Sequence, residues 1–330
     1  MLKSLKSITF GVVAAALMAS VAHADVTVYT AGPQSLIDKL SAGFTKQTGI
    51  KVNVFQATTG KVMARIEAEA ANPVVDVLVS ASWDTATDFA KRGWHVKYSS
   101  PNAAKVPDFL KTESAVAQGI SALGIAWNTK SGTPKPTEWA DLTSKEYTEW
   151  ADLTSKEYKD LVNIPDPAQS GSSFELTAAL AGQDGFKLFN DLKANGAIIA
   201  GANADALNPV LQGAKAAVFG AVDYITLAAK AKGESIDVIF PASGTVIAPR
   251  PAMILNWSKN QDDAKKFIDY MLSDEGQKAV ADEMLMPARA DIPANRPLIS
   301  DLKLLKYDTA TVYGKRKETL AEISKIYGGK

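Results

Sequence analysis

The sequence contains no cysteine and only two histidines, His23 and His95, among its 330 residues. The missing cysteines exclude disulfides, cysteine-ligated zinc, iron–sulfur clusters and thiol catalysis. Two histidines are too few for most histidine-rich metal sites, and they leave little choice for the histidine of a Ser-His-Asp triad. Neither sign of charge is in excess, because 36 Lys and Arg residues balance 36 Asp and Glu residues. The chain lacks the basic footprint of a nucleic-acid-binding protein, and we expect no nucleic-acid partner.

Familiar catalytic motifs are also missing. The sequence has no G-x-S-x-G, no H-E-x-x-H, no S-x-x-K with S-D-N or K-T-G, and no phosphate-binding G-x-x-x-x-G-K-[ST] loop. We therefore expect no catalytic residue, no metal site and no cofactor, and we expect that the protein is not an enzyme. A secreted hydrolase of phosphate esters is the competing hypothesis from another class, although it lacks a metal cluster and a base near a nucleophile.

A long apolar run occurs at the N-terminus, from Ile8 to Ala22, behind the basic residues Lys3 and Lys6. The run is too short to span a bilayer comfortably. Ala22-His23-Ala24 has the small-x-small pattern of a signal-peptide cleavage site. Residues 1–24 are predicted to be a secretory signal peptide cleaved after Ala24, which favours the bacterial periplasm. An uncleaved membrane anchor is the alternative interpretation.

The full chain has the composition of a soluble globular protein, with 46% hydrophobic and 22% charged residues. Strand, polar loop and helix alternate three times, with strands expected at 26–30, 50–55 and 74–79. Further strands are expected at 122–127, 162–164, 197–200, 216–219 and 236–240, and helices at 261–272, 274–283 and 317–327. This order predicts an α/β fold with doubly wound, mainly parallel sheets, and the length suggests about two domains.

One segment is repeated. Residues 137–147 read TEWADLTSKEY, and residues 148–158 read TEWADLTSKEY again. A single tandem copy is not a solenoid, which needs several stacked units. We interpret it as a recent in-frame duplication or an assembly error, with one copy surplus to the fold.

Hydroxyl and glycine residues gather where predicted strands end and helices begin. Parallel sheets bind ligands at that edge, and a helix N-terminus offers free N–H groups and a partial positive charge. Such loops together predict a site for an anion, especially a phosphate or phosphonate. The alternative is that these residues only cap helices or form turns. The candidates are Ser35, Thr58, Thr59, Gly60, Ser80, Ser82, Ser170, Gly171, Ser172 and Ser173.

Four more candidates follow later strands. Asn203 and Asp205 are placed to contact ligand hydroxyls or to cap a helix. Asp223 is placed to bind a sugar hydroxyl or an amine, and Tyr224 to stack or donate, unless both are simply structural. No basic residue carries a decisive signal, although Lys61, Arg65 and Arg250 lie near these loops.

Several motifs together resemble the periplasmic substrate-binding proteins of ABC importers. The family that the chain resembles includes proteins that bind ferric ion, aminoethylphosphonate or hexose phosphates. The resemblance covers residues 25–300, and it rests on segments 26–29, 76–78, 124–129, 164–171, 264–277 and 287–289. It implies two α/β lobes of the type II arrangement, joined by two crossing strands near Ile120 and residues 242–249, with the ligand between them. The expected lobes are residues 25–121 with 247–330, and residues 122–246.

The resemblance also implies partners, namely a small-molecule ligand and an inner-membrane permease, with the protein acting as a monomer. Ferric binders of this family typically use a Tyr-Tyr pair, often with His and Glu. Here Asp223-Tyr224 offers one tyrosine, and Thr30-Ala31-Gly32-Pro33 offers no histidine. We therefore expect an anionic organophosphate such as a hexose phosphate, with ferric ion as the alternative ligand.

Overall fold

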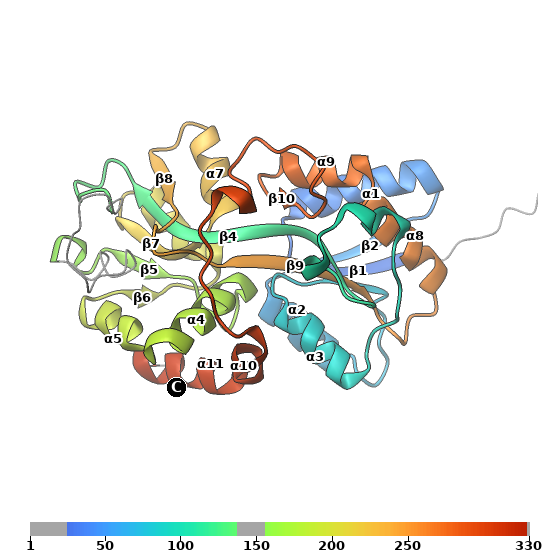
Figure 1. Cartoon of the computed structure of the whole chain (residues 1–330), viewed down its shortest axis with the longest axis horizontal. Coiled ribbons are helices and arrows are strands. Elements are labelled where there is room, and N and C mark those ends of the chain that lie inside the picture. The colour runs from blue at the N-terminus through green and yellow to red at the C-terminus, as the bar shows by residue number, and fades with distance from the viewer. Residues whose placement is uncertain (1–24, 137–155, 329–330) are drawn as a thin grey trace, which may run out of the picture.

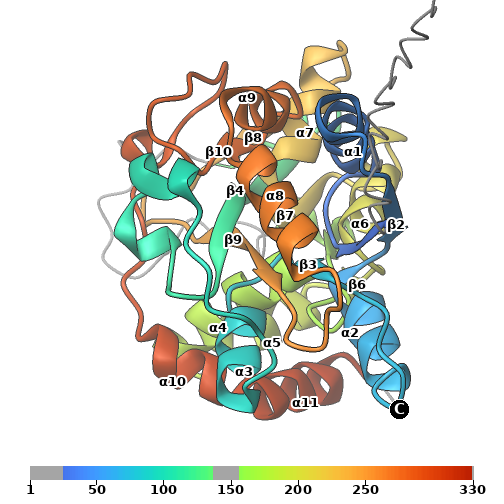
Figure 2. The same cartoon turned by 90° about the vertical axis from the view of Figure 1, so that its right-hand side faces the viewer.

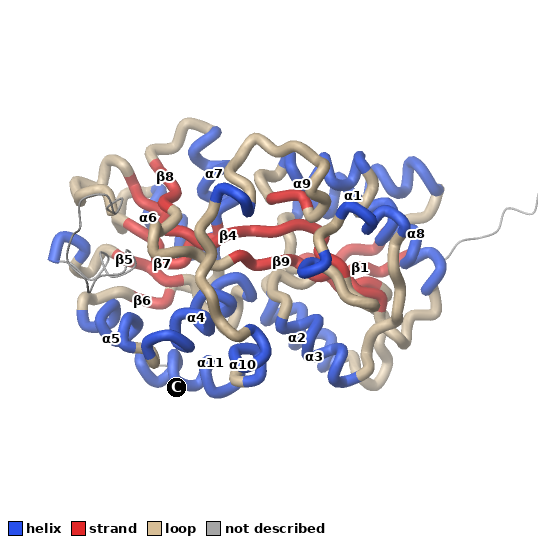
Figure 3. The backbone as a smooth tube through the Cα atoms, viewed as in Figure 1, coloured by secondary structure: helices blue, strands red, loops and turns tan. Residues whose placement is uncertain are grey.

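The computed structural model describes residues 25–136 and 156–328. Two α/β lobes lie side by side and are joined by two long antiparallel strands, β4 (Val116–Asn128) and β9 (Ile247–Ile254) (Figure 1). The strands pair in the order β2-β1-β3-β9-β4-β7-β5-β6, with β10 and β8 also paired to β4. The strands run through the middle of both lobes, and helices cover them above and below (Figure 3). The predicted two-lobed α/β fold is confirmed.

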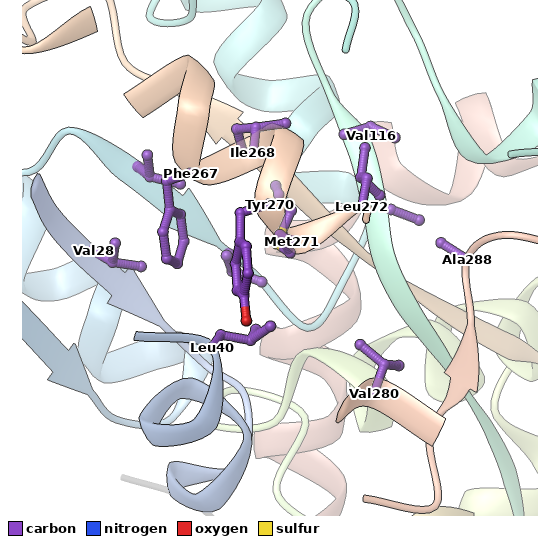
Figure 4. Packing of buried hydrophobic residues seen from close by; sticks show 14 of the residues in the cluster. Val28, Leu40, Val116, Phe267, Ile268, Tyr270, Met271, Leu272, Val280 and Ala288 are labelled. Atoms are coloured by element: carbon purple, nitrogen blue, oxygen red, sulfur yellow. The ribbon is translucent and has the colours of Figure 1, made fainter. Parts of the chain in front are cut away.

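The first lobe is built on parallel pairing of β1 (Val26–Thr30) with β2 (Val52–Gln56) and β3 (Val77–Val79). Alternate residues of β1 point to opposite faces, so Val28 packs with one helix layer and Tyr29 with the other. The first layer holds α1 (Gln34–Thr48), α8 (Gln261–Met271) and α9 (Asp274–Asp282) (Figure 4). The second layer holds α2 (Thr59–Ala68) and α3 (Asp84–Arg92). The short strand β10 (Met286–Pro287) follows α9 and pairs with β4.

The second lobe has the parallel strands β5 (Val162–Ile164), β6 (Ile198–Ile199) and β7 (Ala217–Val222), with β8 (Ile236–Ile239) antiparallel to β4. One face is covered by α4 (Gly171–Asp184) and α5 (Lys187–Ala194). The other face is covered by α6 (Asn203–Leu211) and α7 (Asp223–Ala231). Each lobe thus buries its sheet between two helix layers, as a doubly wound sheet requires.

The C-terminal helices are α10 (Thr309–Gly314) and α11 (Arg316–Tyr327). They lie on a different lobe from the one predicted from sequence. The predicted boundary placed residues 247–330 in the first lobe, whereas both helices pack against the second lobe. Val312 packs on Phe174 of α4, and Ile323 joins the core of the second lobe. The chain passes from the first lobe back to the second lobe near residue 303, where Thr245 N donates to Lys303 O at 2.8 Å. This is a third connection between the lobes.

Two sequence predictions lie largely or wholly outside the described residues. The signal peptide, residues 1–24, is one of them, and most of the repeat at 137–158 is the other. Of the second copy of the repeat, the described Tyr158 is buried and its hydroxyl donates to Pro134 O. Within residues 25–136 and 156–328, no helix combines the length and hydrophobicity needed to cross a membrane.

Candidate ligand site between the lobes

Two helix N-termini from opposite lobes meet at glycine residues. Gly60 N, at the start of α2, donates to Gln169 O, just before α4, at 3.2 Å. Gly171 opens α4, and a Cβ added there would lie 2.9 Å from Thr59 Oγ1 and 2.9 Å from Ser82 Cβ. Any side chain at these two glycines would hold the lobes apart. The structure therefore brings together four predicted site residues in a closed contact: Thr59, Gly60, Ser82 and Gly171.

Several of the predicted hydroxyls serve the local backbone, as the capping interpretation expected. Thr58 Oγ1 accepts from Lys61 N at 3.4 Å, and Ser170 Oγ accepts from Ser173 N at 3.1 Å. Ser173 Oγ donates to Pro165 O at 2.6 Å. Ser80 Oγ lies 2.8 Å from Thr85 Oγ1, inside the loop that leads into α3. These hydroxyls fix the loops that surround the contact between the lobes.

One buried hydroxyl at this contact has no partner in the protein. It is Thr59 Oγ1. Ser172 is also buried, but its Oγ lies 3.1 Å from Ser170 Oγ and accepts from Asn203 Nδ2 at 3.3 Å. Asn203 Oδ1 accepts from Ser170 Oγ at 3.0 Å, so α6 orients the N-terminus of α4. A buried polar atom without a partner costs free energy, and a bound polar ligand would remove that cost.

Arg250 is a buried charged group for which the sequence pattern holds no decisive signal. It lies on the crossing strand β9 and is 1% exposed. Its Nη2 donates to Ala31 O at 2.5 Å, its Nε has no partner, and its guanidinium carbon lies 6.0 Å from the Tyr224 ring centroid. Burial lowers the pKa of the Arg250 guanidinium. Among the described residues, Arg250 forms no ion pair with a carboxylate.

The surroundings of Arg250 connect it to the loop after β1. A Cβ on Gly32 would lie 3.7 Å from Arg250 Nη2 and 4.0 Å from Gln118 Oε1. Gln118 is buried on β4, and its Oε1 has no partner. Gln56 Nε2, at the end of β2, donates to Gly32 O at 2.9 Å. An unpaired cation and an unpaired acceptor thus lie at the same loop, where the first lobe meets the crossing strands.

The remaining candidates are held by other groups. Asp223 is fully buried, forms an ion pair with Arg296 of the first lobe, and accepts from Ala122 N at 2.9 Å. The Asp223 carboxylate thus has a structural partner in Arg296, while its Oδ1 is buried without a hydrogen-bond partner, so the sugar contact expected from sequence stays a prediction. Tyr224 packs against the cores of both lobes. Burial raises the pKa of the Tyr224 phenol, which therefore stays protonated.

Asp205 and Ser35 are exposed. Asp205 Oδ2 accepts from Ala202 N at 3.0 Å and thereby caps α6. Ser35 Oγ donates to Glu283 at 2.6 Å. Both side chains thus have partners in the protein, Asp205 at the N-terminus of α6 and Ser35 on the surface, and their ligand contacts stay predictions.

A two-lobed α/β protein with polar loops meeting across its crossing strands has the architecture of a solute receptor that closes on its ligand. A profile of the family described as bacterial extracellular solute-binding protein matches residues 26–283, and the chain belongs to this family. It is a solute-binding protein of an ABC importer, and its relatives are periplasmic proteins.

Individual relatives differ in what they are named for. A candidate 2-aminoethylphosphonate-binding periplasmic protein of Salmonella typhimurium is 25% identical over 289 residues, covering 82% of this chain and 81% of that protein. The major ferric iron-binding protein of Neisseria meningitidis is 26% identical over 325 residues, covering 90% and 89%. The fold is similar to the periplasmic binding protein AfuA of Actinobacillus pleuropneumoniae with fructose-6-phosphate bound, with a TM-score of 0.80, 22% identity and 92% and 98% of the two chains covered.

Proposed function

We propose that this protein captures an anionic organophosphate, such as a hexose phosphate, between its lobes and delivers it to an inner-membrane ABC permease. The observation that carries the proposal is Arg250, a guanidinium that is 1% exposed and forms no ion pair with a described carboxylate. Fully buried arginines are rare unless they are paired. A ligand phosphate is the counter-ion that this arrangement lacks.

The polar groups around the closed contact support an anion further. The N-termini of α2 and α4 face each other there, and each carries a partial positive charge. Thr59 and Ser172 add hydroxyl groups that can donate to phosphate oxygens. Binding through N–H groups, hydroxyls and one guanidinium suits reversible capture, because the ligand exchanges its hydration for fixed donors when the lobes close.

A ligand that carries hydroxyls as well as a phosphate group fits this site. Gln118 Oε1 is a buried acceptor without a partner, so it needs a donor, and the fully ionised phosphate group of a monoester has no proton to offer it. A sugar hydroxyl would satisfy this acceptor. We therefore favour a phosphorylated, hydroxyl-bearing compound as the ligand class.

Ferric ion is the second candidate, because relatives in the family are named for it. Iron(III) prefers anionic oxygen ligands, and the buried guanidinium of Arg250 beside Tyr224 would repel a trivalent cation. We further propose that the protein is processed after Ala24 and works in the periplasm as a monomer.

Calorimetry with a panel of ligands tests the proposal. The purified protein would be titrated with glucose 6-phosphate, 2-aminoethylphosphonate, inorganic phosphate and ferric citrate. The proposal predicts the tightest binding for a phosphorylated organic compound. Ferric citrate as the tightest ligand would overturn it in favour of the iron alternative, and phosphate release from glucose 6-phosphate would favour the hydrolase.

A further inference from the structure

The C-terminal helices α10 and α11 are anchored on the second lobe. Val312 packs with Phe174 and Ala178 of α4, and Tyr327 Oη donates to Phe189 O at 3.1 Å. α10 and the start of α11 nevertheless face the first lobe, where Arg316 contacts α3 (Figure 1, Figure 2). They therefore form a surface of one lobe that faces the other.

Arg316, the first residue of α11, reaches across to the first lobe. Its Nη1 donates to Asp84 Oδ2 at 2.6 Å, and its guanidinium carbon lies 4.1 Å from the centroid of the Phe174 ring. Asp84 is the first residue of α3 and is buried. The side chain of Arg316 is thus held on the second lobe by an aromatic ring, while its charge is paired on the first.

Glu175 on α4 makes a parallel connection. Its Oε1 accepts from Ser82 Oγ at 2.7 Å and from Trp83 N at 2.8 Å, both in the first lobe. Its Oε2 accepts from Tyr313 Oη of α10 at 2.9 Å. Glu175 is 0% exposed, so the closed lobes bury its carboxylate completely.

Two carboxylates from opposite lobes therefore meet at one hydroxyl, because Ser82 Oγ lies within hydrogen-bond distance of both Glu175 and Asp84 and has one proton to share between them. Like charges this close repel each other unless a cation or a proton compensates them. Arg316 is the cation that the structure places beside Asp84. Next to it, a pocket of about 370 Å³ between α2, α3 and the C-terminal helices gives solvent a way toward the ion pair.

We infer that α10 and α11 form a latch that stabilises the closed arrangement of the lobes. The latch consists of the ion pair between Arg316 and Asp84, with the hydrogen bonds of Glu175 to the first lobe and to Tyr313 beside it. The latch uses no atom of the ligand, so the inference stands independently of the proposed function. Opening the lobes would separate Arg316 from Asp84, and closing them would re-form the pair. Loss of Arg316 leaves the two carboxylates facing each other and favours the open arrangement.

Distance measurements between spin labels test the latch without any ligand. The chain has no cysteine, so Ala90→Cys on α3 and Ser324→Cys on α11, both at exposed positions, give one label on each lobe. We expect Arg316→Ala to shift the ratio of short to long distances by about tenfold toward long ones, the low end of the scale for a hydrogen bond to a charged group, because Arg316 is partly exposed. Lys317→Ala, an exposed neighbour on α11, should leave the distribution unchanged.

An Arg316→Ala distribution that matches the unsubstituted labelled protein would overturn the latch, and so would an equal shift in Lys317→Ala. Thermal unfolding of each variant shows whether it is folded. If Arg316→Ala does not fold, Arg316→Gln takes its place, and the same shift is expected. Because no ligand is present, failure here leaves the proposed ligand class untouched.

Discussion

Replacing Glu175 by glutamine should change how the stability of the protein depends on pH. Burial, with Asp84 nearby, raises the pKa of Glu175 from its ordinary value of 4.5 to about 7. The charged group that faces it is Asp84 on α3, which is paired with Arg316 of α11, and the phenols are Tyr313 and Tyr307. Glutamine keeps an acceptor for Ser82 and Trp83 N, and it has the shape of the protonated acid.

The expected magnitude follows from proton linkage. A carboxyl whose pKa is higher in the folded protein stabilises it fully below the unfolded value of 4.5, and this stabilisation is lost as pH rises through about 7. A shift of this size corresponds to about 3 kcal/mol, and about 2–3 kcal/mol of it is lost between pH 5 and pH 8. The Glu175→Gln side chain does not titrate. The free energy of unfolding of the variant, relative to that of the natural protein, should therefore rise by about 2–3 kcal/mol between pH 5 and pH 8.

Urea denaturation at several pH values between 5 and 8 measures the difference directly. The two proteins should have similar free energies of unfolding near pH 5, and the variant should be more stable near pH 8. Glu318→Gln, at an exposed position on α11, is the control and should follow the natural protein throughout. Parallel curves for Glu175→Gln and the natural protein would refute the reasoning, because they would mean that Glu175 is already charged in the folded state.

Three further predictions follow from the contacts between the lobes. Thr59→Ala and Ser172→Ala should each weaken binding of glucose 6-phosphate by about 1–3 kcal/mol in calorimetry, and unchanged affinity in both would remove them from the site. Gly60→Ala should lower affinity by hindering closure, because its Cβ would lie 2.6 Å from Ala168 O; a dissociation constant equal to that of the natural protein would show that the lobes close without this contact. Asp223→Asn should destabilise the fold by about 3–5 kcal/mol in urea denaturation, because it leaves Arg296 as an unpaired buried charge; an intact stability with a selective loss of sugar-phosphate binding would support its ligand role.

Local patterns predicted the elements of the first lobe well. The alternation at Val26–Thr30 and the apolar run that includes Val77–Val79 predicted the strands, since both reflect burial on a sheet. The hydroxyl-rich loops after these strands were also found, because helix N-termini favour such residues. Thr58 caps α2, whereas the neighbouring hydroxyl of Thr59 has no partner. A local sequence pattern does not distinguish the two, because the outcome depends on how the folded loops lie.

Arg250 was hard to select for the same reason. Its burial comes from Ala31, Gln118 and Tyr224, which are distant in sequence. The available signal was a single charge inside the apolar strand Ile247–Ile254, where an arginine needs a special reason to be buried. The lobe to which the C-terminal helices belong is equally hard to predict from sequence, because their packing on α4 and α5 of the second lobe is a long-range contact.

The central claim is that Arg250 is the counter-ion of a phosphorylated ligand, and native mass spectrometry of the purified protein tests it most directly. The natural protein should carry a phosphorus-containing organic compound that unfolding releases. Arg250→Gln, purified in the same way, should carry none and should bind that compound at least about thirtyfold more weakly, as expected for loss of a buried charge pair. Arg65→Gln, a partly exposed arginine paired with Glu69, should behave as the natural protein does. Bound iron without such a compound, or equal ligand loading of Arg250→Gln, would contradict the account.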